Sequence, residues 1–147
     1  MNIVDVLKHE HQSLKLTVEA LQKGFAHPKR KKVFFKGLSK ELMAYTQAKQ
    51  KTIYKQLKAA EEVRSDILAS AEEAMLVESL RWQMEDEELS EEEWDAKGRT
   101  LCKVLLHHLE SEEKDTLPLA RRVLDTASLE ALGQAFEEEK IRFIACH

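Results

Sequence analysis

The sequence contains few of the residues that interrupt helices, with only 4 glycines and 2 prolines among 147 residues. No segment alternates polar and apolar residues with a period of two, so we expect no β-sheet. No run approaches the roughly 18 consecutive apolar residues that span a membrane. The two cysteines, Cys102 and Cys146, are too few for a disulfide framework and are typical of a protein in a reducing cytoplasm.

Signals for targeting and for nucleic-acid binding are also scarce. The segment Met1–Asp5 has no basic stretch followed by an apolar run, so we expect no signal peptide and a cytoplasmic location. A formal net charge of -4 gives no reason to expect nucleic-acid binding, and we expect no membrane association. We interpret the basic run Lys29–Lys32 as a solvated loop and helix start, in preference to a phosphate-binding patch, and the acidic run Glu85–Glu93 as a solvated connection.

What the sequence does contain is helical periodicity in a chain that is 43% hydrophobic and 34% charged. Apolar residues recur every three or four positions, which predicts four long helices and a shorter C-terminal one. Their expected ranges are about 3–23, 31–60, 64–84, 90–118 and 128–145. Asn2 and Ser90 are suitable N-caps, and Pro118 is expected to kink or end the fourth helix.

Long amphipathic helices joined by short connections favour one all-α architecture. We expect an antiparallel up-down four-helix bundle with a short additional C-terminal helix. The length is sufficient for one sizeable core, so we expect a single domain over residues 1–147.

Two of the predicted helices carry metal-ligating residue types at core positions. On the fourth helix, His108 and Glu112 are four residues apart and continue the apolar stripe formed by Leu101 and Leu105. On the first helix, His11 lies on the apolar stripe. Metal sites in helical bundles use side chains that converge from several helices, so these three residues are candidate ligands. The alternative for His11 is a neutral imidazole that is hydrogen-bonded within the core.

The second predicted helix directs a different pair of residues at the same core. Tyr45 and Lys49 are also four residues apart and lie on its apolar stripe. A protonated lysine would repel a metal ion. The core therefore combines part of a metal site with a residue that opposes metal binding.

Several segments of the chain match a known family pattern. Leu7–His11 places an acidic residue just before the core histidine, and His107–Glu113 carries the His-x-x-x-Glu pair. With Ile53-Tyr54 and the stretch Leu129–Gly133, these segments resemble the hemerythrin-like HHE cation-binding domains nearly end to end. The fourth-helix motif is the most specific of them.

The resemblance implies a set of ligand positions. In the family, one histidine on each of four helices, and a glutamate four residues after the second and fourth, hold two bridged irons. By this resemblance, three of the positions fall on His11, His108 and Glu112. The other three fall on Tyr45, Lys49 and Ala74, so the resemblance implies a degenerate site whose remaining ligands are unoccupied.

The replaced residues predict how the core is stabilised without metal. We expect the Lys49 ammonium to occupy roughly the place of an iron and to pair with Glu112, which would otherwise be an unpaired buried carboxylate. We expect the Tyr45 hydroxyl to hydrogen-bond His11 or a carboxylate. The alternative is that Lys49 extends along its alkyl stem to solvent.

The small side chain at the third-helix position has a packing consequence. Ala74 leaves space that a histidine would fill in the family pattern. We expect either Trp82 or Tyr45 to pack inward toward that space.

Three functions follow from these features. The first is a non-enzymatic binding or sensing module without a cofactor, whose partner is a protein, a second copy or a small ligand in the vacated core. The second is a metal-binding protein that uses His11, His108 and Glu112 to hold iron, di-iron or mononuclear, or zinc. It would bind oxygen or nitric oxide, or store or sense iron. The third is a hydrolytic or redox enzyme with His108 as base, which no nucleophile or phosphate motif supports. We therefore expect no enzymatic activity.

Overall fold

The computed structural model of the protein describes residues 1–147, and all of its regular structure is helical. The five long helices are α1 (Ile3–Gly24), α2 (Pro28–Lys49), α4 (Arg64–Gln83), α5 (Glu91–Ser111) and α7 (Thr126–Cys146). The short elements are α3 (Lys55–Ala59), a 3-10 turn (Glu61–Val63), α6 (Leu117–Val123) and two π-helical segments (Gln50–Tyr54 and Glu112–Thr116). The expected all-α class is confirmed.

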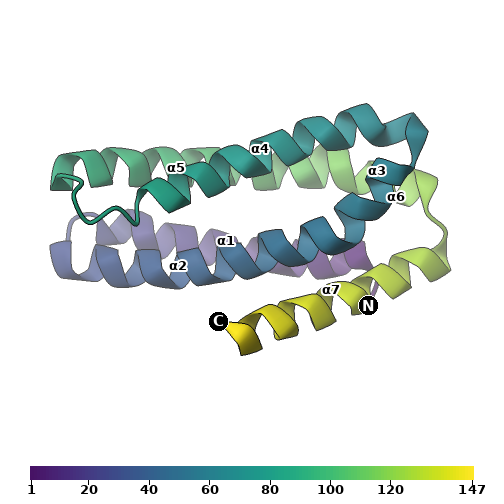
Figure 1. Ribbon diagram of the computed structural model, residues 1–147, viewed down its shortest axis with the longest axis horizontal. Helices are drawn as coiled ribbons and strands as arrows, with labels where there is room; N and C mark the ends of the chain where they lie inside the picture. The colour runs from purple at the N-terminus through teal and green to yellow at the C-terminus, as the bar shows by residue number, and fades with distance from the viewer.

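The helices α1, α2, α4 and α5 extend along the long axis of the molecule, as Figure 1 shows. Helix α1 packs against α2, and α4 packs against α5. Helix α7 lies across the outer side of α1 and α2. None of the helices combines the length and the apolar character that a membrane crossing requires.

The helix starts follow the local sequence. The Asn2 side chain accepts a hydrogen bond from the Asp5 backbone N–H at 3.0 Å, which confirms Asn2 as the N-cap of α1. The Ser90 hydroxyl accepts from the Glu93 backbone N–H at 3.1 Å, as expected for α5. Helix α2 begins earlier than expected, at Pro28, because proline fits the first helical position and needs no N–H partner there.

Two of the predicted helices are not regular over their full length. The range 31–60 divides into α2, a π-helical segment and α3, and the fourth predicted helix divides in the same way. Pro118 was expected to kink or end this helix, and it does not end it, because the chain stays helical to Val123. Pro118 lies in the first turn of α6, and the π-helical segment Glu112–Thr116 directly precedes it.

The C-terminal helix was expected to be short, and this is wrong, because α7 has 21 residues, as many as α5. Its first half buries Leu132 and Phe136 against the bundle, whereas Ile141 and Ile144 in its second half are exposed. The amphipathic pattern therefore covers only part of the helix. The expected range of about 128–145 nevertheless differs from that of α7 by only two residues at its start and one at its end.

The basic run Lys29–Lys32 is not a solvated connection throughout. The Lys31 side chain is buried, with its ammonium 2.8 Å from Asp95 and 2.9 Å from Glu91. The Lys32 ammonium lies 3.8 Å from the centre of the Trp94 ring. This run therefore joins the start of α2 to α5.

Candidate functional site

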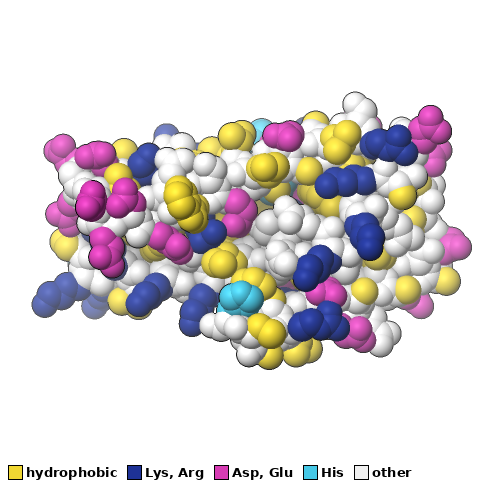
Figure 2. Space-filling model, viewed as in Figure 1, with side chains coloured by type: hydrophobic (Ala, Val, Ile, Leu, Met, Phe, Trp, Pro, Cys, Tyr) yellow, Lys and Arg dark blue, Asp and Glu magenta, His cyan; other side chains and the backbone are white.

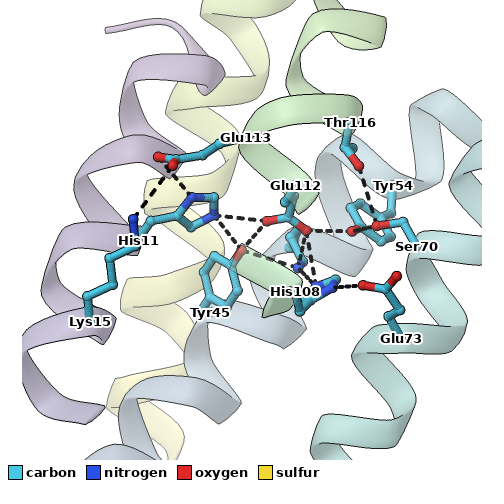
Figure 3. A network of polar contacts seen from close by, with 11 residues as sticks. His11, Lys15, Tyr45, Tyr54, Ser70, Glu73, His108, Glu112, Glu113 and Thr116 are labelled. Atoms are coloured by element: carbon cyan, nitrogen blue, oxygen red, sulfur yellow. Dashed lines mark hydrogen bonds and ion pairs between the residues drawn. The ribbon is translucent and has the colours of Figure 1, made fainter. Parts of the chain in front are cut away.

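Glu112 is fully buried and is the centre of the polar network shown in Figure 3. It is the first residue of the π-helical segment that follows α5. Its two oxygens accept hydrogen bonds from four side chains of α1, α2 and the π-helical segment after α2: His11, Tyr45, Lys49 and Tyr54. A carboxylate offers about four lone pairs, so the acceptor capacity of Glu112 is filled.

The two oxygens of Glu112 have different neighbours. Oε1 lies 2.9 Å from Nε2 of His11 and also accepts from the Tyr45 hydroxyl. Oε2 lies 2.5 Å from the ammonium nitrogen of Lys49 and 2.5 Å from the Tyr54 hydroxyl. Each oxygen therefore receives one phenol and one nitrogen donor.

The hydrogen-bond donors of Lys49 are all used, as are the acceptors of Glu112. Its ammonium nitrogen lies 2.5 Å from Glu112 Oε2, 3.1 Å from His108 Nε2 and 3.2 Å from the Tyr45 hydroxyl. An ammonium has three N–H donors, so every one has an acceptor. It also lies 4.4 Å from the centre of the Tyr45 ring. The predicted pairing of Lys49 with Glu112 is confirmed, and the alternative of a lysine that reaches solvent is wrong.

The hydrogen-bond partners assign the tautomers of both histidines. Lys49 has only donors, so His108 Nε2 accepts, and the proton of His108 is on Nδ1, which donates to Glu73 at 3.1 Å. The carboxylate has only acceptors, so Nε2 of His11 carries a proton and donates to Glu112. His11 Nδ1 lies 3.3 Å from Glu113 but forms no hydrogen bond.

The electrostatics of the centre favour a charged pair beside neutral phenols. Burial alone would raise the pKa of Glu112, but the Lys49 ammonium and the hydrogen bond from His11 hold it well below its usual range. Burial lowers the pKa of Lys49, and the Glu112 carboxylate opposes that shift. Burial and the same carboxylate raise the pKa of Tyr45 well above its ordinary value, so its phenol stays protonated.

The network reaches the surface on the side of α4. The Tyr54 hydroxyl lies 2.6 Å from Ser70, which in turn lies 3.4 Å from the Thr116 hydroxyl. Ser70, Thr116 and the His108 partner Glu73 line a surface cleft of about 450 Å³. The buried centre is therefore linked to the surface through hydrogen-bonded side chains.

The two π-helical segments position the network. They contain Tyr54 and Glu112, and they lie in the two helices that supply most of its donors and acceptors. Lys49 and Tyr54 are five residues apart, which in a regular α-helix separates two side chains by about 140° around the axis. The π-helical turn brings both onto Glu112. Such segments are frequent at functional sites.

The structure brings together five of the six residues that the sequence marked: His11, Tyr45, Lys49, His108 and Glu112. The sixth, Ala74, is buried on α4 and has no polar side-chain atom to join the network. Trp82 does not pack inward, because its side chain is 69% exposed, whereas Tyr45 is buried. No three His, Cys, Asp or Glu side chains are arranged so that they could hold a metal ion.

Sequence reasoning did not identify Tyr54, Ser70, Glu73 and Glu113 as part of the network. Tyr54 follows Lys49 at a spacing that indicates a different helix face, and only the π-helical turn changes this. For Glu73 the sequence gave one signal: it is an acidic residue directly before Ala74, which the resemblance places at a ligand position. Ser70 had no signal in the sequence.

Comparison with known proteins gives one match. The family model described as the hemerythrin HHE cation binding domain matches residues 2–120, which extends from the N-cap of α1 into α6. No curated protein and no solved structure matches the chain. The matched range contains every residue of the buried network.

Proposed function

The chain belongs to the hemerythrin HHE cation-binding domain family, and we propose that it is a member in which the Lys49 ammonium replaces the bound iron. In this proposal residues 1–147 form one cytoplasmic domain, with α1, α2, α4 and α5 as the antiparallel up-down bundle and α7 as an addition. The protein has no catalytic activity and acts as a binding or sensing module.

The observation that carries the proposal is the set of three contacts of the Lys49 ammonium. The nitrogen uses lone pairs of Glu112 Oε2 and His108 Nε2 that a metal ion would need. A cation placed beside these atoms would lie against the positive charge of Lys49. The residues present therefore do not fit a di-iron centre.

The second supporting observation concerns Tyr45. Tyrosine binds a metal as the phenolate, but burial and the Glu112 carboxylate raise the pKa of Tyr45 well above its ordinary value. Its hydroxyl instead donates to Glu112 and lies 2.9 Å from His11 Nε2. Ala74 supplies no ligand atom on α4.

The burial of the network supports a non-enzymatic role. His108, the candidate base, is 2% exposed, and its two ring nitrogens contact Lys49 and Glu73. No serine, threonine or cysteine nucleophile contacts it. A substrate would have to displace internal hydrogen bonds to reach the imidazole.

One observation favours the alternative of a metal-binding protein. His11 and His108 approach the same carboxylate, with ring nitrogens 2.9 Å and 3.3 Å from Glu112 oxygens. Burial also lowers the pKa of Lys49, and a neutral lysine would repel a cation less strongly. In this reading a mononuclear iron or zinc ion is held by His11, His108 and Glu112.

Metal content distinguishes the two readings. The purified protein is equilibrated with iron(II) under nitrogen or with zinc(II), freed of excess metal and subjected to elemental analysis. We expect substoichiometric metal in the wild type and a clear gain in the triple variant Tyr45→His, Lys49→Glu, Ala74→His. The matched control is Lys51→Glu, which makes the same charge change at an exposed position two residues away and should gain no metal.

Stoichiometric iron in the wild type, with oxo-bridge absorption bands, would overturn the proposal. Stoichiometric zinc that is lost in Glu112→Gln would support the alternative instead. Circular dichroism of each variant establishes that it is folded before its metal content is compared.

A further inference from the structure

The end of α1 and the first half of α2 carry a positively charged surface. From Ala20 to Lys40 the sequence contains seven lysines and arginines but no aspartate or glutamate. Lys31 is buried against α5, and the other six are exposed: Lys23, Lys29, Arg30, Lys32, Lys36 and Lys40. We call these six residues, with the exposed Val33 among them, the basic surface. Figure 2 shows Lys and Arg side chains following one another along the lower left edge of the molecule, over this half of α2.

The cations of α2 surround Val33 on one side of the helix. At 100° per residue, four of them lie within about 60° of Val33 around the helix axis: Lys29, Arg30, Lys36 and Lys40. At 1.5 Å per residue, they extend over about 16 Å along that axis. Ala44, on the same side, is buried, and α7 packs against α2. The exposed part of this side is therefore the first half of the helix.

The chain does not neutralise this charge with ion pairs. None of the six cations forms one, whereas the buried Lys31 pairs with Glu91 and Asp95. Lys31 lies about 160° from Val33 around the helix axis, so these two carboxylates are on the far side of α2. Figure 2 shows the acidic side chains at this end of the molecule gathered above the basic ones.

Three other carboxylates border the basic surface and offset part of its charge. Glu85 accepts a hydrogen bond from Arg81 of α4, and Glu41 accepts from two hydroxyls of α1. Glu19, near the end of α1, lines a surface cleft beside Arg30. The six exposed cations exceed these carboxylates in number, so the surface stays positive at neutral pH.

We propose that the basic surface binds the anionic phospholipid headgroups of a membrane, with α2 lying along the bilayer surface and no helix inserted. Clusters of about four to eight lysines and arginines on an amphipathic helix are typical of such binding. The apolar stripe of α2 stays in the bundle core, so the attraction depends mainly on charge. The net charge of -4 gave no reason to expect membrane association. That sum includes distant acidic residues, whereas salt screens exposed charges beyond about 8–10 Å, so the nearest charges decide the contact.

The exposed apolar side chains favour a lipid surface over a nucleic acid. Val33 and Leu16 are each 67% exposed, and Leu16 lines the same cleft as Arg30. Apolar side chains gain free energy at the boundary of headgroups and acyl chains, but not beside a sugar-phosphate backbone. Phe34 and Phe35 of α2 are partly or fully buried, so neither projects to stack on bases. The spread of the cations over about 16 Å also fits several headgroups better than a single phosphate ion.

Membrane binding is independent of the chemistry in the core. Of the residues of α2, Tyr45 and Lys49 join the network around Glu112, and both are buried and follow the last cation of the basic surface. Loss of metal binding is therefore not a premise of this proposal, and the two proposals can fail separately.

Co-sedimentation with lipid vesicles is the direct test. The protein should sediment with vesicles of phosphatidylcholine and phosphatidylserine but not with vesicles of phosphatidylcholine alone, and added salt should release it. The double variant Lys36→Gln, Lys40→Gln should bind about 25-fold more weakly, because each cation near an anionic surface contributes about fivefold. The matched control Lys55→Gln, Lys58→Gln removes two exposed cations of α3 and should bind like the wild type. No binding to the anionic vesicles at low salt, or an equal loss in the two double variants, would overturn the proposal.

A second measurement separates a lipid surface from a nucleic acid. Val33→Gln keeps every charge but should bind the anionic vesicles about threefold more weakly, because it removes an apolar side chain from the contact. If Val33→Gln binds like the wild type, and duplex RNA binds more tightly than the vesicles at the same salt concentration, the lipid surface is the wrong ligand. All of these variants should keep the circular dichroism and metal content of the wild type, so a loss of vesicle binding does not report on the core.

Discussion

The ammonium nitrogen of Lys49 lies 2.5 Å from Oε2 of Glu112, in a part of the core where both side chains are 0% exposed. Two buried charges cost several kcal/mol each in lost hydration, so a pair of this kind persists only where the remaining donors and acceptors are satisfied. Every N–H of the ammonium has an acceptor, and each carboxylate oxygen has two donors. One charged centre therefore connects α1, α2 and α5.

Removal of the ammonium should destabilise the protein strongly. We expect Lys49→Met to lower the free energy of unfolding by about 3–5 kcal/mol, the usual cost of breaking a buried ion pair from one side. Methionine keeps the length of the side chain but leaves Glu112 without its counter-ion. Urea denaturation near neutral pH, followed by circular dichroism, measures the loss.

The matched control for this change is Lys51→Met. Lys51 lies two residues away, is 53% exposed and is 3.7 Å from Glu139. We expect a change below about 0.5 kcal/mol, as is usual for exposed positions. If Lys49→Met and Lys51→Met lower the free energy of unfolding by similar amounts, the buried pair contributes no more to stability than an exposed lysine does.

Acid should destabilise the wild type through Glu112. The folded protein holds the pKa of this carboxyl well below its ordinary value of 4.5. The stabilisation is therefore fully present above the unfolded-state pKa and is lost as the pH falls through the lower folded-state pKa. Glu112→Gln cannot titrate, so its stability should fall less steeply between about pH 5 and pH 2. Thermal unfolding across this range measures the slope, and Glu110→Gln, at an exposed position, should retain the wild-type slope.

Each phenol of the network should contribute through its hydroxyl. Tyr54→Phe removes a donor to Glu112 and the 2.6 Å contact with Ser70. We expect a loss of about 1.5–3 kcal/mol in unfolding free energy, typical of a hydrogen bond to a charged group. In a Glu112→Gln background the same change should cost less, because the charged acceptor is gone. A double-mutant cycle, with stabilities measured by urea denaturation, tests this coupling. If the losses from Tyr54→Phe and Glu112→Gln add in the double variant, the two side chains are not coupled and the prediction is wrong.

Gly133 should be intolerant of a side chain. A Cβ atom there would clash with the Met1 carbonyl oxygen and would lie 3.0 Å from the Asn2 carbonyl carbon, both backbone atoms. Gly133→Ala should therefore displace α7 from the start of α1 and lower the unfolding free energy by about 1–3 kcal/mol, as overpacking usually does.

The control for this position is Gly37, in the interior of α2, where a Cβ would meet nothing within 4 Å. Gly37→Ala should stabilise the protein by about 0.5–1 kcal/mol, because alanine loses less backbone entropy in a helix. Thermal unfolding of the two variants checks both predictions, because the melting temperature should fall in Gly133→Ala and rise in Gly37→Ala. A neutral Gly133→Ala would mean that α7 is not held tightly against the N-terminal turn.

The sequence predicted those parts of the fold that depend on local patterning. Helical class, most helix ends and the N-caps Asn2 and Ser90 follow from periodicity and capping chemistry, which act within a few residues. The contact between Lys49 and Glu112 was also predictable, because a charge at a core position needs a partner of opposite sign. Family resemblance placed the two residues at the same depth.

Other features could not be predicted from local sequence patterns. The sequence could not show that Gln50–Tyr54 and Glu112–Thr116 are π-helical, so it could not place Tyr54 beside Lys49. Of the two residues expected to pack inward, Tyr45 is buried but Trp82 is not, because α4 is apolar on two sides and periodicity does not distinguish which side the bundle covers. Lys31 was expected in solvent, but Glu91 and Asp95 of α5 bury it.

The sequence by itself determined that the chain is helical, which residues face the core, and that Lys49 lies on a core-facing stripe as His108 and Glu112 do. These properties are fixed by residue type and by a helical repeat that any segment carries on its own. The tertiary structure alone decided which atoms of Glu112, Lys49, His11 and His108 meet, and hence the tautomers of the histidines. Those contacts join residues up to 101 positions apart, so they exist only once the helices have packed.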